Sequence, residues 1–131
     1  MEQLLRTPGG SAVACNQVLY NLSRRGIEFD LLPWCRERGI PIMAYSPIEQ
    51  ARLLKRKVVQ EVAVRHEATP AQACLAWALR QPDVIAIPKA GTSDHVSENH
   101  GALALRLADD DLRQLDDAFP PPREHRALEM I

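Results

Sequence analysis

The sequence predicts an α/β protein with parallel strands, arranged either as an open sheet or as part of a barrel. Three short and largely apolar runs lie along the 131 residues. Segments with helical periodicity separate these runs and follow the last of them. Short apolar runs joined by helical crossovers are typical of a parallel sheet. The alternation of strand and helix is the only repeat in the chain.

The first strand and helix follow a turn at Pro8-Gly9-Gly10. The residues from Ala12 to Tyr20 are mostly apolar and predict a strand. From Glu28 to Arg38 the pattern becomes helical, with apolar residues on one side and charged residues on the other. Gly39 is expected to end this helix.

The second strand spans Ile40 to Tyr45, and Ser46-Pro47 stops it at once. A longer helical region follows in two parts, divided at Thr69-Pro70. The threonine is expected to act as N-cap of the second part, with the proline at the first helical position. Each part has its own apolar stripe: Val58, Val59, Val62 and Ala63 in the first, and Cys74, Leu75, Ala78 and Leu79 in the second.

The third strand, Val84 to Ile87, is expected to be buried. Gly91 gives a turn, and Ser93 or Asp94 can cap a helix that runs from about residue 94 to residue 105. Lys89 lies between this strand and the helix start, where unpaired backbone N–H groups and a lysine together suit an anion such as phosphate. The alternative is an ordinary loop lysine beside a capped helix.

The end of the chain contains one more helix and a tail. Asp109-Asp110-Asp111 opens the helix, since acidic residues favour a first turn, and Leu112, Leu115 and Phe119 follow at helical spacing. The proline-rich start of residues 120–131 predicts an extended tail. We expect one domain over residues 1–131.

The composition excludes several classes of protein. The net charge is −1, and no basic cluster exceeds Lys55-Arg56-Lys57, so neither nucleic acid nor a membrane is an expected partner. No targeting segment or membrane span is expected. The three cysteines are far apart and not at metal-ligand spacing from a histidine, which predicts reduced thiols, a cytoplasmic protein and no metal site.

A set of sequence blocks, all in order between about residues 11 and 120, resembles the carboxy-terminal half of an aldo-keto reductase of the bacterial branch. The blocks are Cys15-Asn16-Gln17-Val18-Leu19-Tyr20-Asn21, Ala44-Tyr45-Ser46-Pro47, Thr69-Pro70-Ala71-Gln72, Ile87-Pro88-Lys89-Ala90 and Glu98-Asn99. The resemblance implies a TIM (β/α)8 barrel, an architecture of roughly 250 residues. The three predicted strands would then be the sixth, seventh and eighth, with the earlier strands missing.

The resemblance also implies which residues would bind a cofactor. The family reduces small aldehydes and ketones with NADPH, and this half would bind it. Gln17 would hydrogen bond to the nicotinamide carboxamide, and Tyr45 would stack on the nicotinamide ring. Ser46, Pro47 and Ile48 would approach the pyrophosphate. Lys89, with Ala90 and His95 nearby, would meet the 2′-phosphate, and Glu98 and Asn99 would hold the adenine.

Two residues depart from the pattern of the family. His95 occupies the position six residues after Lys89 where many relatives carry an arginine, and Ala90 replaces a frequent hydroxyl. Histidine is a weaker and pH-dependent partner for a phosphate. The expected cofactor is therefore NADP(H), with NAD(H) as the alternative.

The catalytic tyrosine of the family, with its aspartate, lysine and histidine, belongs to the first half of the barrel. We therefore expect no catalytic residue in this chain, which would be inactive alone and would meet a small carbonyl substrate only when completed by an amino-terminal half. The alternative function is a non-catalytic half-barrel that associates with itself or with another chain. Three strands cannot close a barrel, so their open edges would favour a partner.

Overall fold

The chain folds around a small parallel sheet in the computed structural model, which describes residues 1–131. The sheet has three strands in the order β1-β2-β3, and both neighbouring pairs are parallel. The prediction of an α/β protein with parallel strands is confirmed. The strands are β1 (Asn16–Leu19), β2 (Ile42–Tyr45) and β3 (Val84–Ile87), and the helices are α1 (Glu2–Leu5), α2 (Leu31–Arg36), α3 (Lys57–Arg65), α4 (Pro70–Leu79), α5 (Ser93–Gly101) and α6 (Asp109–Ala118).

The helices cover one face of the sheet and leave most of the other bare; only its β1 end is covered, where Leu19 is 4% exposed and lies near the tail. Ile42 and Ala44 are fully buried on the covered face, where α4 packs against β3. On the opposite face Ile85 and Ile87 remain 46% and 38% exposed. The expectation of a buried third strand is therefore wrong for half of its residues, because no element of the chain lies over that part of the face.

Each of the first two strands is shorter than expected. Residues 10–12 form a 3₁₀ turn, so β1 begins only at Asn16, and β2 begins at Ile42.

The helix expected from Glu28 begins instead at Leu31, because Asp30 accepts a hydrogen bond from the backbone N–H of Leu31 at 2.7 Å and caps it. Gly39 follows this helix with φ of +64°, a conformation that favours glycine.

The division of the long helical region at Thr69 is confirmed. The Thr69 hydroxyl accepts a hydrogen bond from the Gln72 N–H, and the Gln72 side chain returns one from the Thr69 N–H, so the two form a capping box. Helix α4 is the most buried helix, and its Trp77 is completely enclosed. The ring of Trp77 lies 5.3 Å from that of Tyr20, which connects α4 to the end of β1.

The helix after β3 differs from the prediction at both ends. Thr92 is the N-cap, with its hydroxyl accepting from the His95 N–H at 3.2 Å, so neither Ser93 nor Asp94 takes that place. The helix ends at Gly101, four residues earlier than expected, and turns lead from there to α6. Helix α6 begins at Asp109 as predicted.

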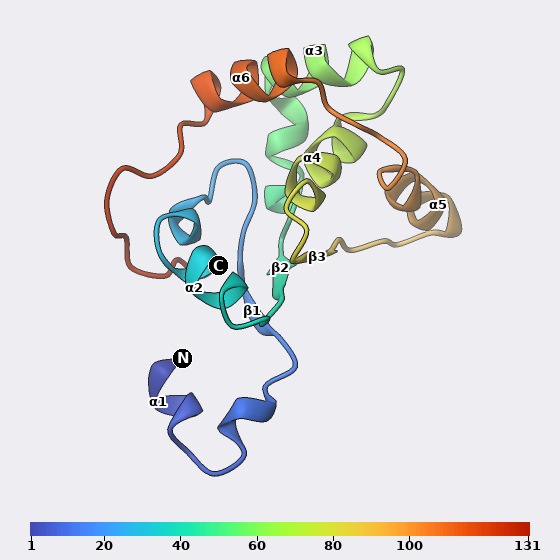
Figure 1. Ribbon diagram of the computed structural model, residues 1–131. Coiled ribbons are helices and arrows are strands. Elements are labelled where there is room, and N and C mark those ends of the chain that lie inside the picture. The colour runs from blue at the N-terminus through green and yellow to red at the C-terminus, as the bar shows by residue number, and fades with distance from the viewer.

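Asp111 in the first turn of α6 joins this helix to α3. Its carboxylate accepts from the Ala108 N–H at 2.9 Å, from Arg65 at 2.6 Å and lies 2.6 Å from His66 Nε2. Burial by itself raises the pKa of Asp111, but the hydrogen bonds from His66, Arg65 and Ala108 outweigh it and lower the pKa to about 2. The carboxylate therefore stays charged near neutral pH. Figure 1 shows α3 and α6 side by side.

Residues 120–131 contain no helix or strand and return from α6 to the neighbourhood of α2 (Figure 1). The three cysteines form no disulfide, and Cys35 and Cys74 are buried. None of the helices combines the length and the apolar character needed to cross a bilayer.

Candidate functional site

The carboxyl ends of the three strands meet at one edge of the sheet. Leu19, Tyr45 and Ile87 are the last residues of their strands, and the register pairs Leu19 with Tyr45 and Tyr45 with Ile87. Because the strands are parallel, the loops after β1, β2 and β3 all emerge at this edge. Ligand sites of parallel α/β folds are formed by loops at this end of the strands.

Gln17 and Tyr45 lie on the bare face of the sheet. Gln17 pairs with Met43, and side chains two residues apart on a strand share a face, so Tyr45 lies on the same side as Gln17. Gln17 is exposed and Tyr45 is partly exposed. Neither side chain hydrogen bonds to another residue of the chain, so both remain available to a ligand.

The loop after β2 is held close to the protein body. Ser46 has φ of +50°, and its carbonyl oxygen accepts a hydrogen bond from the Asn21 side chain at 2.9 Å. Pro47 is buried, and Ile48 packs against the hydrophobic core. The backbone of this loop is therefore fixed at the edge of the sheet.

Lys89 follows the third strand and is free of ion pairs. It lies two residues beyond Ile87, which pairs with Tyr45, so the cation and the tyrosine come from neighbouring strands at the same edge. The lysine side chain is exposed, Ala90 is partly buried and His95 is exposed in the first turn of α5. A free cation thus lies beside the start of a nine-residue helix.

Glu98 and Asn99 are half-buried residues of α5. The Gln72 amide of α4 donates a hydrogen bond to the Glu98 carbonyl oxygen at 2.9 Å and fixes this part of α5. Gly101 allows the close approach, since a Cβ there would lie 2.5 Å from the Gln72 amide nitrogen. Asn99 also lines a cavity of about 390 Å³ between β3, α4 and α5.

The predicted cofactor residues therefore form two groups. Tyr45, residues 46–48 and Lys89 lie at the carboxyl edge of the sheet, whereas Gln17 is two residues before the end of β1, and Glu98 and Asn99 belong to α5. Gln17, Tyr45 and residues 46–48 come from β1, β2 and the loop after β2. Residues 89–99 come from the loop after β3 and from α5. No hydrogen bond or ion pair joins the side chains of the two groups.

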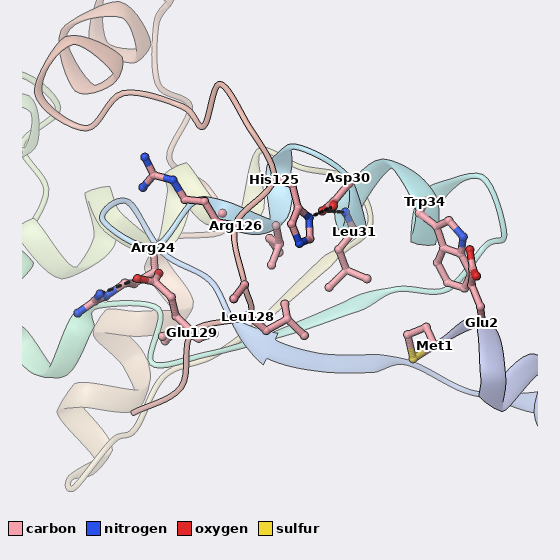
Figure 2. A pocket seen from close by; sticks show the side chains of 14 residues that line it. Met1, Glu2, Arg24, Asp30, Leu31, Trp34, His125, Arg126, Leu128 and Glu129 are labelled. Carbon is pink, nitrogen blue, oxygen red and sulfur yellow. Dashed lines mark hydrogen bonds and ion pairs between the residues drawn. The ribbon is translucent and has the colours of Figure 1, made fainter.

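A separate cavity of about 590 Å³ lies elsewhere (Figure 2). It is bounded by β1, α2 and the tail, and none of the predicted cofactor residues lines it. Nδ1 of His125, in the tail, lies 2.5 Å from a carboxylate oxygen of Asp30 at this cavity. This hydrogen bond is the main cause that lowers the pKa of Asp30. No cluster of histidine, cysteine or acidic residues has the arrangement of a metal site.

A cluster of polar side chains beneath the loop after β2 was not predicted from the sequence. It consists of Asn21, Arg24 and Glu49. The Glu49 carboxylate accepts from the side chains of Asn21 and Arg24, and the Asn21 side-chain oxygen accepts from the Arg24 backbone N–H. Asn21 belongs to one of the sequence blocks that resemble the family. Glu49 lies 28 residues further along the chain, in a loop whose sequence has no periodicity. No local sequence signal pairs the two.

The loops that carry Ser46 and Lys89 follow the carboxyl ends of two parallel strands, and α/β-barrel proteins form their ligand site from such loops. The chain belongs to the aldo/keto reductase family, whose model matches residues 1–119. Among curated proteins, it is similar to methylglyoxal reductase YeaE of Escherichia coli, with 47% identity over the whole chain and 48% of that protein. It is also 33% identical to a probable aldo-keto reductase of Glycine max, over 79% of the chain and 39% of that protein.

Solved structures agree with this family. The chain matches an aldo-keto reductase from Klebsiella pneumoniae in complex with NADPH, with a TM-score of 0.96, 44% identity, and coverage of 99% of this chain and 48% of that chain. The predicted fold class, part of the TIM-barrel fold of the family, is therefore confirmed. The chain spans about half the length of the YeaE reductase and of the Klebsiella enzyme.

Proposed function

We propose that this chain is the cofactor-binding half of an aldo-keto reductase that reduces aldehydes and ketones with NADP(H). The observation that carries the proposal is the free Lys89 cation beside the start of α5, at the same edge of the sheet as Tyr45. The NADPH complex of the similar Klebsiella enzyme supports the choice of cofactor.

The second group of residues suits the adenosine end of NADP(H). Lys89 would neutralise the 2′-phosphate, with Ala90 and His95 nearby, and backbone N–H groups in the first turn of α5 would face the same anion. Glu98 and Asn99 would hold the adenine. Because the lysine has no competing carboxylate, its charge is available to a phosphate.

The first group suits the nicotinamide end. Gln17 would hydrogen bond to the carboxamide, and Tyr45 would stack on the ring over the bare face of the sheet. Ser46, Pro47 and Ile48 would approach the pyrophosphate. The bound nicotinamide supplies the hydride, and the residues of this chain hold it in place.

The chain alone is expected to be inactive. In the family, the proton donor and its three assisting residues lie in the first half of the barrel. This chain aligns with about half of the length of its relatives. Reduction of a carbonyl needs a proton donor placed at the oxygen as well as a hydride. A small carbonyl substrate would therefore react only where an amino-terminal half completes the barrel.

The experiment is a binding titration followed by a turnover assay on the purified chain. NADPH fluorescence is expected to change on mixing, and methylglyoxal is not expected to accelerate NADPH oxidation. The E. coli reductase YeaE, under the same conditions, is the positive control for turnover. Unchanged NADPH fluorescence would contradict the cofactor role, and methylglyoxal-dependent oxidation would contradict the inactivity.

A second candidate function, a self-associating half-barrel, is favoured by the bare face of the sheet. Ile85 and Ile87 expose apolar surface there, and β1 and β3 each have one unpaired edge. A second copy of the chain could cover this face and both edges by symmetry.

Light scattering after size exclusion tests this candidate. We expect a dimer at high protein concentration, and Ile85→Asp is expected to shift it to monomer, because the substitution puts a charge into the apolar contact. Val64→Asp is the matched control, since Val64 is 75% exposed on α3, away from the sheet. A monomer at every concentration would exclude self-association.

We also propose a cytoplasmic location. Cys15, Cys35 and Cys74 stay unpaired in the fold. Unpaired cysteines are usual in a reducing compartment. Localisation of a tagged chain tests the proposal, and export from the cytoplasm would contradict it.

A further inference from the structure

The loop after β2 has a backbone that needs external support. Glu49, Gln50 and Ala51 have φ of +49°, +50° and +66°, so three consecutive residues other than glycine adopt the left-handed conformation. Each such residue costs about 1–2 kcal/mol relative to a right-handed one. Conformations of this kind persist only where the surrounding structure determines them.

The support comes from the buried side chains of Asn21 and Glu49 and from the partly exposed side chain of Arg24. Glu49 is 4% exposed, and one of its carboxylate oxygens accepts from Asn21 Nδ2 at 2.7 Å. The other oxygen accepts from Arg24 Nε at 3.1 Å and from an Arg24 terminal nitrogen at 3.0 Å. Two donors of one guanidinium on one carboxylate fix the position of Glu49 more narrowly than a single contact could.

Asn21 extends this support to the beginning of the loop. Its side-chain nitrogen also donates to the Ser46 carbonyl oxygen at 2.9 Å, and the side chain is fully buried. Its oxygen accepts from the backbone N–H groups of Ser23 at 2.9 Å and Arg24 at 3.1 Å. Asn21 thereby connects the turn after β1 to both ends of the segment 46–49.

The negative charge of Glu49 is compensated locally. A lone buried carboxylate would oppose a pyrophosphate, but Arg24 pairs with Glu49 at 3.0 Å and Arg52 lies 3.8 Å from the same carboxylate. Hydrogen bonds to Glu49 first, and then to Glu129, raise the pKa of Arg24 above its usual value, so the guanidinium stays charged.

We propose that Asn21, Arg24 and Glu49 are positioning residues, which hold the loop after β2 in the shape that receives the cofactor pyrophosphate. The inference rests on the proposed cofactor function. It adds residues that touch neither cofactor nor substrate but set the conformation of those that do. A loop that is ordered in only a fraction of molecules binds its ligand more weakly by that fraction.

Figure 2 shows a second carboxylate on the same arginine, which provides a matched control. Glu129 of the tail accepts from Arg24 at 3.0 Å, but its side chain is 45% exposed, whereas that of Glu49 is 5% exposed. Exposed ion pairs contribute little to a structure. Glu49→Gln and Glu129→Gln therefore make the same chemical change on the same partner, and only the first is expected to release the loop.

The experiment measures the dissociation constants of two ligands, NADPH and 2′-AMP, for the whole chain. The second ligand carries the adenine and the 2′-phosphate but no pyrophosphate. Glu49→Gln is expected to weaken NADPH binding about tenfold and to leave 2′-AMP binding within about twofold. Amide hydrogen exchange at residues 48–52 is expected to accelerate without ligand. Glu129→Gln is expected to change each quantity less than about twofold.

Several outcomes would overturn the inference. Unchanged NADPH binding by Glu49→Gln, with unchanged exchange in the loop, contradicts the positioning role, and so does an equal loss for both ligands. If circular dichroism shows that Glu49→Gln does not fold, Arg24→Gln makes the same test at a site that is 33% exposed. Failure of the unmodified chain to bind NADPH overturns the proposed function, and this inference with it.

Discussion

Replacement of Lys89 by methionine is expected to weaken NADPH binding about 10- to 100-fold and to leave NADH binding nearly unchanged. Lys89 is the exposed cation between β3 and α5 and has no ion-pair partner in the chain. NADPH differs from NADH by the 2′-phosphate, so the loss of a charge-assisted contact to that phosphate affects NADPH alone. Methionine keeps the length and apolar character of the side chain.

The measurement is a fluorescence titration of both nucleotides against the unmodified chain and two variants. Lys57→Met is the matched control, because Lys57 is 90% exposed on α3 and pairs only with Glu61. An equal effect of Lys89→Met on both nucleotides would show that Lys89 does not recognise the 2′-phosphate. The difference between the two nucleotides also tests whether His95 and Ala90 allow a preference for NADPH.

Replacement of Trp77 by alanine is expected to lower the free energy of unfolding by about 3–5 kcal/mol, a large share of the stability of an ordinary domain. Trp77 is fully buried, and it packs against Tyr20 and beneath the Arg80 guanidinium, whose carbon lies 3.9 Å from the ring centroid. Alanine leaves a cavity where α4 contacts the residue that follows β1. Urea unfolding followed by circular dichroism measures the difference.

The variant Trp77→Phe tests the packing contribution of Trp77 alone. The indole N–H of Trp77 is buried without an acceptor, so its removal breaks no hydrogen bond. Phenylalanine keeps an aromatic ring in the same place and leaves a smaller cavity than alanine, so it is expected to lower the free energy of unfolding by less than the alanine variant does. A loss as large as that of the alanine variant would contradict this account of the core.

Local signals in the sequence were sufficient for part of the fold. Thr69-Pro70 marks the start of α4 because a cap and a proline act within a single turn. Val84–Ile87 matches β3 residue for residue. The cap of α5 was missed because Thr92, Ser93 and Asp94 are three adjacent residues that all suit the position. Only the backbone path of the loop decides among them.

Long-range features could not be predicted from the sequence. His66 meets Asp111 across 45 residues, and Glu49 meets Asn21 across 28, so no spacing rule pairs either of them. The exposure of Ile85 depends on whether another element covers the sheet, which a run of apolar residues does not reveal. The two groups of cofactor residues came from the family resemblance, and their binding roles stay predictions.

The path of the last twelve residues has a consequence for the kinetics of folding. The carbonyl oxygen of Phe119 accepts from the buried Arg25 at 2.6 Å. Beyond it, two side-chain contacts hold the chain end: His125 with Asp30, and Glu129 with Arg24. These join residues 95 and 105 positions apart, so loop closure is slow, and their exposure makes each of them weak. The segment is therefore expected to dock last and to detach first, in a sub-global opening that leaves the three-stranded sheet intact.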